Sequence, residues 1–220
     1  MGHFLAVSAF KDQSVDSVAT HVKDYLARYG VTCDAVGEGN PDESQDALLY
    51  PPSNNWTVVL WPAYFNIHDF ELCGRLSSAM QTLVSTIHVY DDDYWAHGLF
   101  RNGSFVDIFA SKPAYFAEDA DEAQRLRKKW KGNPQVIAAA LTIPVESVAP
   151  YLVHVDQSNA QQKAFPSDEF ARENSGSSLT SGSGWELLTP TTWACLKGNS
   201  DWDEDLTGRS QLQMDMSCRL

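Results

Sequence analysis

The chain has 220 residues, of which 43% are hydrophobic and 11% aromatic, so it can fill a real core and is not a disordered chain. Its 29 Asp or Glu against 16 Lys or Arg give a formal net charge of −13 at pH 7. A surface of that charge repels phosphate backbones and anionic membranes and favours basic partners. No stretch approaches the roughly 18 apolar residues of a membrane span, and the first residues lack the pattern of a secretory signal. We therefore expect a soluble, cytoplasmic protein.

The first part of the chain, to about residue 112, predicts strands joined mostly by hairpins, with two helices. Helix 14–30 begins after Ser14, which is a favourable N-cap, and ends at Gly30. Helix 70–83 follows Asp69. Strands are predicted over 3–10, 31–36, 84–92 and, around a Pro-Pro-Ser-Asn-Asn turn, twice within 47–62. Helices are too few for a doubly wound sheet, so the predicted fold class is α+β with a mostly antiparallel sheet.

A further hairpin is predicted around Asn102-Gly103, a dipeptide typical of two-residue type I′ turns. The predicted pairs are Arg101 with Ser104, Phe100 with Phe105, Leu99 with Val106, Gly98 with Asp107, and His97 with Ile108. One face would carry Trp95, His97, Leu99, Val106 and Ile108, and the other Tyr94, Phe100, Phe105 and Phe109. Since both faces are largely apolar, we expect both to be covered.

A helical segment follows over 117–155. Helix Ala117–Lys131 has acids in its first turn and bases in its last, matching the helix dipole. Asn133-Pro134 opens a short helix, and Pro144 opens another with the sequence VESVAPYL. We expect residues 1–155 to form one α+β domain, 156–184 a polar Ser/Gly-rich linker, and 185–220 an extended tail whose tryptophans dock on that domain.

Neither a cofactor nor a metal site is predicted. The four cysteines (Cys33, Cys73, Cys195 and Cys218) form no Cys-x-x-Cys pair and are expected to be buried free thiols. The six histidines form no metal-binding pattern, and no phosphate-binding loop or nucleophile elbow occurs.

Residues 133–152 are spaced like a helix-turn-helix, but nucleic-acid binding is not expected. The second helix would present Val145, Glu146, Ser147 and Val148, without the Arg or Lys that reads bases and contacts phosphates. The strongly acidic chain opposes phosphate contacts as well.

Two segments place acids beside aromatic residues and are the candidate partner-binding sites. They consist of Asp91, Asp92, Asp93, Tyr94 and Trp95, and of Asp201, Trp202, Asp203 and Glu204. Three consecutive aspartates in a strand point to alternate faces, which argues against a shared metal ion and leaves a solvated strand end or a charged docking rim. Tyr and Trp are favoured interface anchors, and an acidic rim speeds capture of a cationic partner.

The layout resembles, in composition, bacterial α+β proteins of which some are immunity proteins to toxins. The leading hypothesis is therefore a non-catalytic acidic protein that neutralises a basic toxin or nuclease by direct protein–protein binding. The alternative is a small hydrolase whose site assembles in the fold around His88, His97 and a nearby Asp. A third hypothesis is a structural subunit of a larger assembly.

Overall fold

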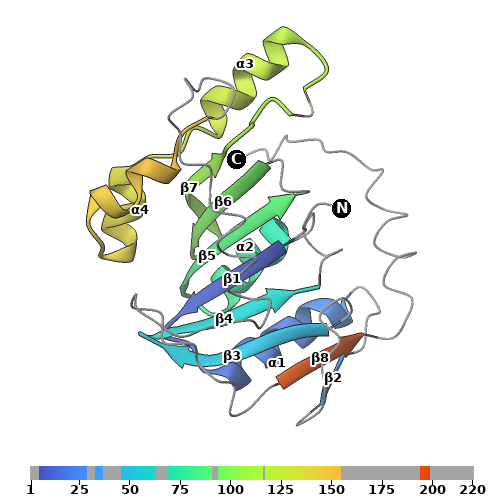
Figure 1. Cartoon of the computed structure of the whole chain (residues 1–220). Coiled ribbons are helices and arrows are strands. Elements are labelled where there is room, and N and C mark those ends of the chain that lie inside the picture. Colours follow the sequence, from blue (N-terminus) through green and yellow to red (C-terminus); the bar gives the residue numbers. More distant parts are fainter. Residues whose placement is uncertain are drawn as a thin grey trace, which may run out of the picture.

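The computed structural model describes residues 5–28, 33–36, 46–62, 69–90, 94–115, 117–154 and 194–198, with the backbone alone at 33–36, 46, 69 and 194–198. The described chain folds into one twisted sheet with helices on both sides (Figure 1). Every strand pair in the sheet is antiparallel. The predicted α+β class is therefore confirmed.

The sheet has eight strands in the order β2-β8-β3-β4-β1-β5-β6-β7. Their bounds are β1 Leu5–Lys11, β2 Cys33–Val36, β3 Asp46–Ser53, β4 Trp56–Trp61, β5 Leu83–Tyr90, β6 Tyr94–Arg101, β7 Ser104–Ala110 and β8 Ala194–Gly198. β1 lies centrally, between β4 and β5. Its alternating burial reflects two differently covered faces.

The larger core lies between one face of the sheet, here called the helix face, and helices α1 (Val15–Ala27) and α2 (Asp69–Ala79). Ser14 caps α1, as predicted, because its hydroxyl accepts a hydrogen bond from Ser17 N at 3.1 Å. The buried side chains of α1 are Val18, Ala19, Val22 and Leu26, at helical spacing. They pack with Phe10, Val59 and Trp61 from the sheet.

α2 ends at Ala79, four residues before the predicted end. Gln81 has a φ of 51°, and a right-handed α-helix cannot continue through a residue with a positive φ. Thr82 N instead donates a hydrogen bond to Ser77 O at 3.1 Å. This turn lets β5 begin at Leu83, so Leu83 is a strand residue and not the last residue of the helix.

A smaller core lies on the opposite face, here called the second face, between β5–β7 and the segment after α3. It is built from Leu83, Leu99 and Ile137, with partly buried residues packed around them. Ile137 belongs to α4 (Pro134–Leu141), which Asn133 caps as predicted by accepting from Gln135 N at 3.1 Å. The helix predicted after Pro144 is instead two 3-10 turns, η2 Val145–Ser147 and η3 Ala149–Tyr151, because Pro150 cannot donate within an α-helix.

The hairpin around Asn102-Gly103 forms, but three of its five predicted pairs are wrong. Arg101 pairs with Ser104 and Phe100 with Phe105, as predicted. Beyond them a β-bulge shifts the register by one residue. The remaining pairs are Leu99–Asp107, Gly98–Ile108 and His97–Phe109. Phe109 therefore shares a face with Trp95 and His97, and Ile108 lies on the other face, opposite to the prediction.

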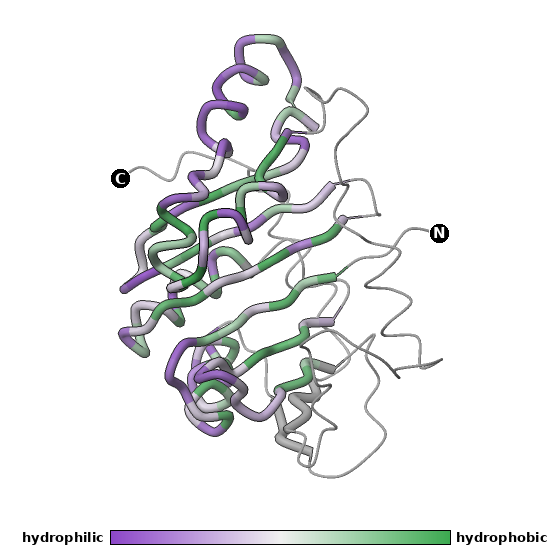
Figure 2. Tube along the Cα trace, turned by 60° about the vertical axis from the view of Figure 1, so that its left-hand side comes forward, coloured by the Kyte–Doolittle hydropathy of each residue, from purple (hydrophilic) through white to green (hydrophobic). Residues whose placement is uncertain are grey.

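The outer edge of β7 is partly closed by the chain that follows α3 (Ala120–Lys129). Ala110 N donates to Trp130 O at 3.1 Å, and Gly132 N donates to Ile108 O at 3.0 Å. α3 itself is shorter than the predicted 117–131 because Asp119 is its N-cap and Trp130 its C-cap. α3 stands away from the sheet and is hydrophilic along most of its length (Figure 2).

The predicted linker 156–184 lies outside the described residues, as does the tail 185–220 apart from the backbone of β8. Of the four cysteines, Cys73 has a described side chain, and it is a buried free thiol as predicted.

Candidate functional site

The end of the sheet where β5 turns into β6 carries two facing tyrosines. Tyr90 closes β5 and Tyr94 opens β6, and the two residues are directly paired. Their rings stack with centroids 5.4 Å apart and planes 27° from parallel. Asp91, Asp92 and Asp93 make the connection between them in the chain and lie outside the described residues. A tyrosine thus flanks the acidic triplet on each side in the sequence.

A third tyrosine joins this pair from the connection that follows β7. The Tyr115 ring lies 5.2 Å from that of Tyr94 and 6.4 Å, edge-on, from that of Tyr90. Lys112 places its Nζ 5.7 Å from the centre of the Tyr115 ring. Tyr115 is 41% exposed. Tyr90, Tyr94 and Tyr115, here called the tyrosine cluster, form a partly exposed aromatic surface.

The phenol of Tyr94 is strongly held in its neutral form. Burial, and then the neighbouring Tyr90 and Tyr115, raise the pKa of Tyr94 to about 12. Tyr94 therefore presents a neutral phenol over the whole physiological pH range, and all three residues present aromatic rings. Such rings bind by apolar contact, by hydrogen bonds from their hydroxyls and by cation–π contact with Lys or Arg.

Trp95 lies beside the aspartates in the chain, but its ring is on the other face of the sheet from Tyr94. It packs on Phe109 with centroids 4.8 Å apart, and Phe109 in turn stacks on His154 at 5.9 Å. Its backbone is fixed too, since Trp95 N donates to Ser111 Oγ at 2.9 Å. Trp95 thus has a packing role, whereas Tyr94 belongs to the surface next to the acids. The second predicted segment, Asp201 to Glu204 with Trp202, lies outside the described residues.

His88 and His97 do not share a site. They come from adjacent strands, but His88 is paired with Ala96 and His97 with Ile87, which places the two imidazoles on opposite faces of the sheet. His88 packs against Phe70 with ring centroids 4.5 Å apart. The pleat of the sheet therefore separates the two imidazoles that the predicted hydrolase site would need side by side.

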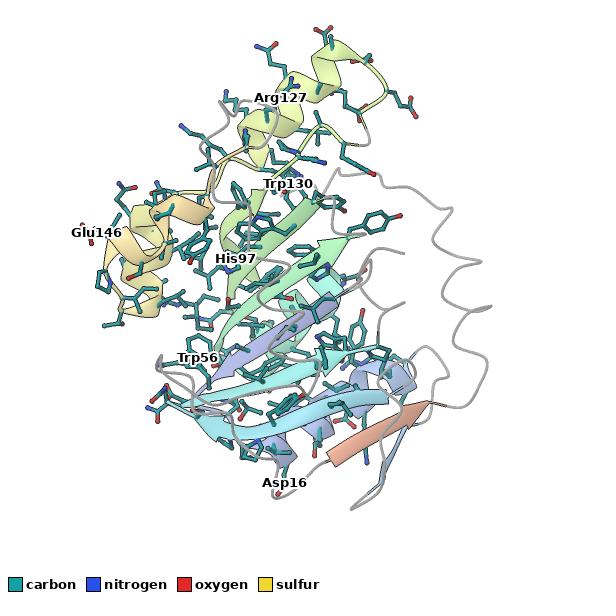
Figure 3. The ribbon with its side chains drawn as sticks, in the orientation of Figure 1. Asp16, Trp56, His97, Arg127, Trp130 and Glu146 are labelled. Atoms are coloured by element: carbon teal, nitrogen blue, oxygen red, sulfur yellow. The ribbon has the colours of Figure 1, made fainter. Side chains whose placement is uncertain are left out.

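His97 instead makes a buried polar contact with Ser85, whose Oγ lies 3.0 Å from its Nε2. Burial lowers the pKa of His97 to about 4. A base this weak is poorly matched to removing a proton from a serine near neutral pH. The pair is best described as a satisfied polar contact within the sheet. Figure 3 labels His97, which belongs to β6.

A second buried polar group lies under α2. Ser8 Oγ accepts from Trp61 Nε1 at 2.7 Å and contacts Thr86 Oγ1 at 2.9 Å and Cys73 Sγ at 3.1 Å. Ser8, Thr86 and Cys73 have no exposed surface, so a substrate cannot reach the hydroxyl or the thiol. This network satisfies buried polar atoms in the core.

Within the ranges that the structure describes, no three His, Cys, Asp or Glu side chains come together in a way that could hold a metal ion. No helix in those ranges is long and apolar enough to cross a membrane. The chain matches no protein-family model, no curated protein and no solved structure.

The sequence pattern predicted Tyr94 and the aspartates as candidates, but it did not point to Tyr90, Tyr115 or Lys112. The stretch Tyr90-Asp-Asp-Asp-Tyr94 is a symmetric hairpin pattern, and pairing across the three acids would have brought the two tyrosines together. Tyr115 carries no such signal, because only the path of the chain after β7 brings it to the cluster.

Proposed function

We propose that this protein is a non-catalytic binding protein that captures a basic protein partner through the tyrosine cluster and the adjacent Asp91–Asp93 connection. The observation that carries the proposal is the three-ring cluster, with Tyr115 partly exposed, joined directly to three consecutive acids. Interfaces commonly combine aromatic anchors with a charged rim that steers an oppositely charged partner.

The net charge of −13 supports a cationic partner over a nucleic acid or an anionic membrane. Lys112 over the Tyr115 ring also illustrates the contact that a partner's Lys or Arg would make with a neighbouring ring. The sharpest form of the proposal is an immunity or inhibitor protein that blocks a basic toxin or nuclease.

The test begins with the full-length tagged chain, used to recover bound proteins from its native host, and with the purified partner in a binding titration. Replacing Tyr115 by Ala should weaken binding about 5- to 30-fold, since loss of an aromatic anchor costs roughly 1–2 kcal/mol. The matched control is Tyr151→Ala, because Tyr151 is equally exposed, at 41%, but lies in η3. Equal affinities of the two variants would overturn the proposed site.

The charge contribution is tested with a second pair of variants. Asp91→Asn, Asp92→Asn and Asp93→Asn together should slow association, and most strongly at low salt. The control removes three charges elsewhere with Asp16→Asn, Asp24→Asn and Glu71→Gln, all at exposed positions of α1 and α2. Both variants have the same net charge, so equal association rates would show that only total charge matters and that the triplet is no docking rim.

A further inference from the structure

The second face of the sheet carries an apolar surface that neither core includes. It consists of the residues Leu5, Val7, Ala9, Tyr50, Val58, Leu60 and Ile87, here called the open patch, and all seven are partly buried. The strand pairing places them on one face, since Val7 lies between Leu60 and Ile87, and Val58 lies between Ala9 and Tyr50. Among the described helices, α1 and α2 pack on the helix face and α4 packs beside β7.

The open patch continues into an apolar groove at the end of the sheet nearest α4. The groove has a volume of about 210 Å³ and is lined by Ala9, Trp56, Ser85, Leu141 and Ile143. Ile143 is 41% exposed, and Lys11 covers the Trp56 ring with its Nζ at 5.0 Å. Trp56 lies at the strand ends close to the α4 segment (Figure 3). An apolar side chain could therefore be buried here against both the sheet and α4.

The path of the chain indicates what occupies this surface. The chain leaves the described domain after His154, which stacks on Phe109 and so lies on the second face. It returns at Ala194, in β8, on the far side of β3. The two ends of segment 155–193, which is 39 residues long, therefore lie six strand spacings apart, about 29 Å, and the segment has to span that distance. An extended chain of that length reaches about 130 Å, so the segment is long enough to span this distance.

The direction of β8 shows at which end of the sheet this strand begins. Ala194 pairs with Leu49, and the strand runs from there towards Asp46, so β8 begins on the side of the sheet where the β3–β4 turn lies. That is the end of the sheet that carries Trp56 and the groove. Extending the same register by one residue would put position 193, a tryptophan, opposite Tyr50 of the open patch.

We propose that residues 185–193, WELLTPTTW, cover the open patch from the groove to β3. The segment has the apolar side chains that the surface needs, Trp185, Leu187, Leu188 and Trp193. Burying two tryptophans and two leucines against this partly exposed apolar face is favourable, because large apolar side chains then leave water. The surface is thus completed from within the chain and is separate from the proposed partner site at the tyrosine cluster.

The test places a reporter cysteine in the open patch of the full chain, Val58→Cys, and measures its rate of maleimide labelling by peptide mass spectrometry. An exposed reporter, Lys128→Cys in α3, gives the reference rate. We expect Val58→Cys to be labelled at least 10-fold more slowly than the reference. Adding Trp193→Ser and Leu188→Ser should raise its rate at least 5-fold, whereas Trp202→Ser should not.

Three outcomes would overturn the proposal. The first is labelling at the reference rate in the otherwise unchanged chain, which would leave the face open to another protein. The second is protection that disappears on dilution, which would assign the face to a second copy of the chain. The third is protection that Trp193→Ser with Leu188→Ser leaves unchanged.

A disulfide test does not depend on those substitutions. With Cys33, Cys195 and Cys218 replaced by Ser, Tyr50→Cys with Trp193→Cys should form an intramolecular disulfide under mild oxidation, because facing strand residues lie within bonding reach. The control pair is Tyr50→Cys with Trp202→Cys. Equal cross-linking of both pairs, or of neither, contradicts the proposed position of residue 193.

Discussion

At the scale of single residues, His97 was a catalytic candidate in the sequence, but the fold buries its imidazole and changes its pKa. Its imidazole is 6% exposed, contacts Ser85 and has a pKa lowered to about 4 by burial. The unfolded chain would titrate this group near 6.5. The folded protein therefore resists protonation of His97 and favours the neutral ring.

This difference predicts how stability depends on pH. Because the folded pKa is the lower one, the stabilisation by neutral His97 is complete above pH 6.5 and is lost as the pH falls from 6.5 towards 4. The loss should reach about 3 kcal/mol. Urea unfolding at pH 7 and pH 4.5 checks this, with His97→Gln expected to show a smaller decrease than the unchanged chain. Identical decreases would show that carboxylates alone control acid sensitivity.

Gly98 is a second residue whose role depends on the fold. A Cβ built at this position would lie 2.3 Å from Cε1 of Phe70 and 2.9 Å from the ring of Phe100. Phe70 comes from the first turn of α2 and covers β6 where this glycine leaves room. The absence of a side chain here is what allows the helix to approach the sheet.

Gly98→Ala should therefore lower the free energy of unfolding by about 1–3 kcal/mol, the usual cost of overpacking. Gly74→Ala is the control, since its Cβ would meet Phe100 at 3.4 Å, an ordinary contact, within a helix that favours Ala. Chemical unfolding measures both. In a Phe70→Leu background the cost of Gly98→Ala should shrink, and an unchanged cost would mean that Phe70 is not the cause.

At the scale of secondary-structure elements, α3 differs from the other helices in how little of it is buried. Leu126 is its buried residue, while Asp119 caps its start and Arg127, Lys128 and Lys129 lie in its last turn. Local capping and charge therefore stabilise much of this helix, and Leu126 is the side chain that it buries against the domain.

We expect Leu126→Ala to release α3 without unfolding the sheet. Hydrogen exchange of the amides of 120–129 should accelerate by a factor of at least 10, while the amides of β1 and β5 keep their protection. Arg125→Ala, at the exposed neighbouring position, is the matched control and should leave exchange unchanged. Loss of protection in β1 would instead show that α3 belongs to the cooperative core.

At the scale of the whole molecule, the net charge of −13 acts on stability as well as on partner choice. Like charges repel in the compact state, and the screening length falls from about 30 Å at 0.01 M ionic strength to about 8 Å at 0.15 M. Calorimetry in 0.01 M and 0.15 M NaCl at pH 7 should therefore show a higher Tm in the higher salt. A lower Tm would mean that attractive ion pairs outweigh the repulsion.

The sequence by itself determined the α+β class and most of the elements in order, because the underlying signals are local. Ser14 and Asn133 cap helices through contacts within three residues, and Asn102-Gly103 forms its turn from two residues' own backbone preferences. The short, nearly continuous apolar runs of β1 and β4 likewise indicate buried strands directly from the sequence.

Only the tertiary structure decided features that depend on distant segments. The bulge after Leu99 shifts Phe109 onto the face of Trp95, where His154 and the bridge to Lys131 hold it. The tyrosine cluster needs Tyr115 to return past β7 to Tyr94, and the separation of His88 from His97 needs both strands in register. Packing between residues far apart in the chain sets these positions, and no local preference encodes it.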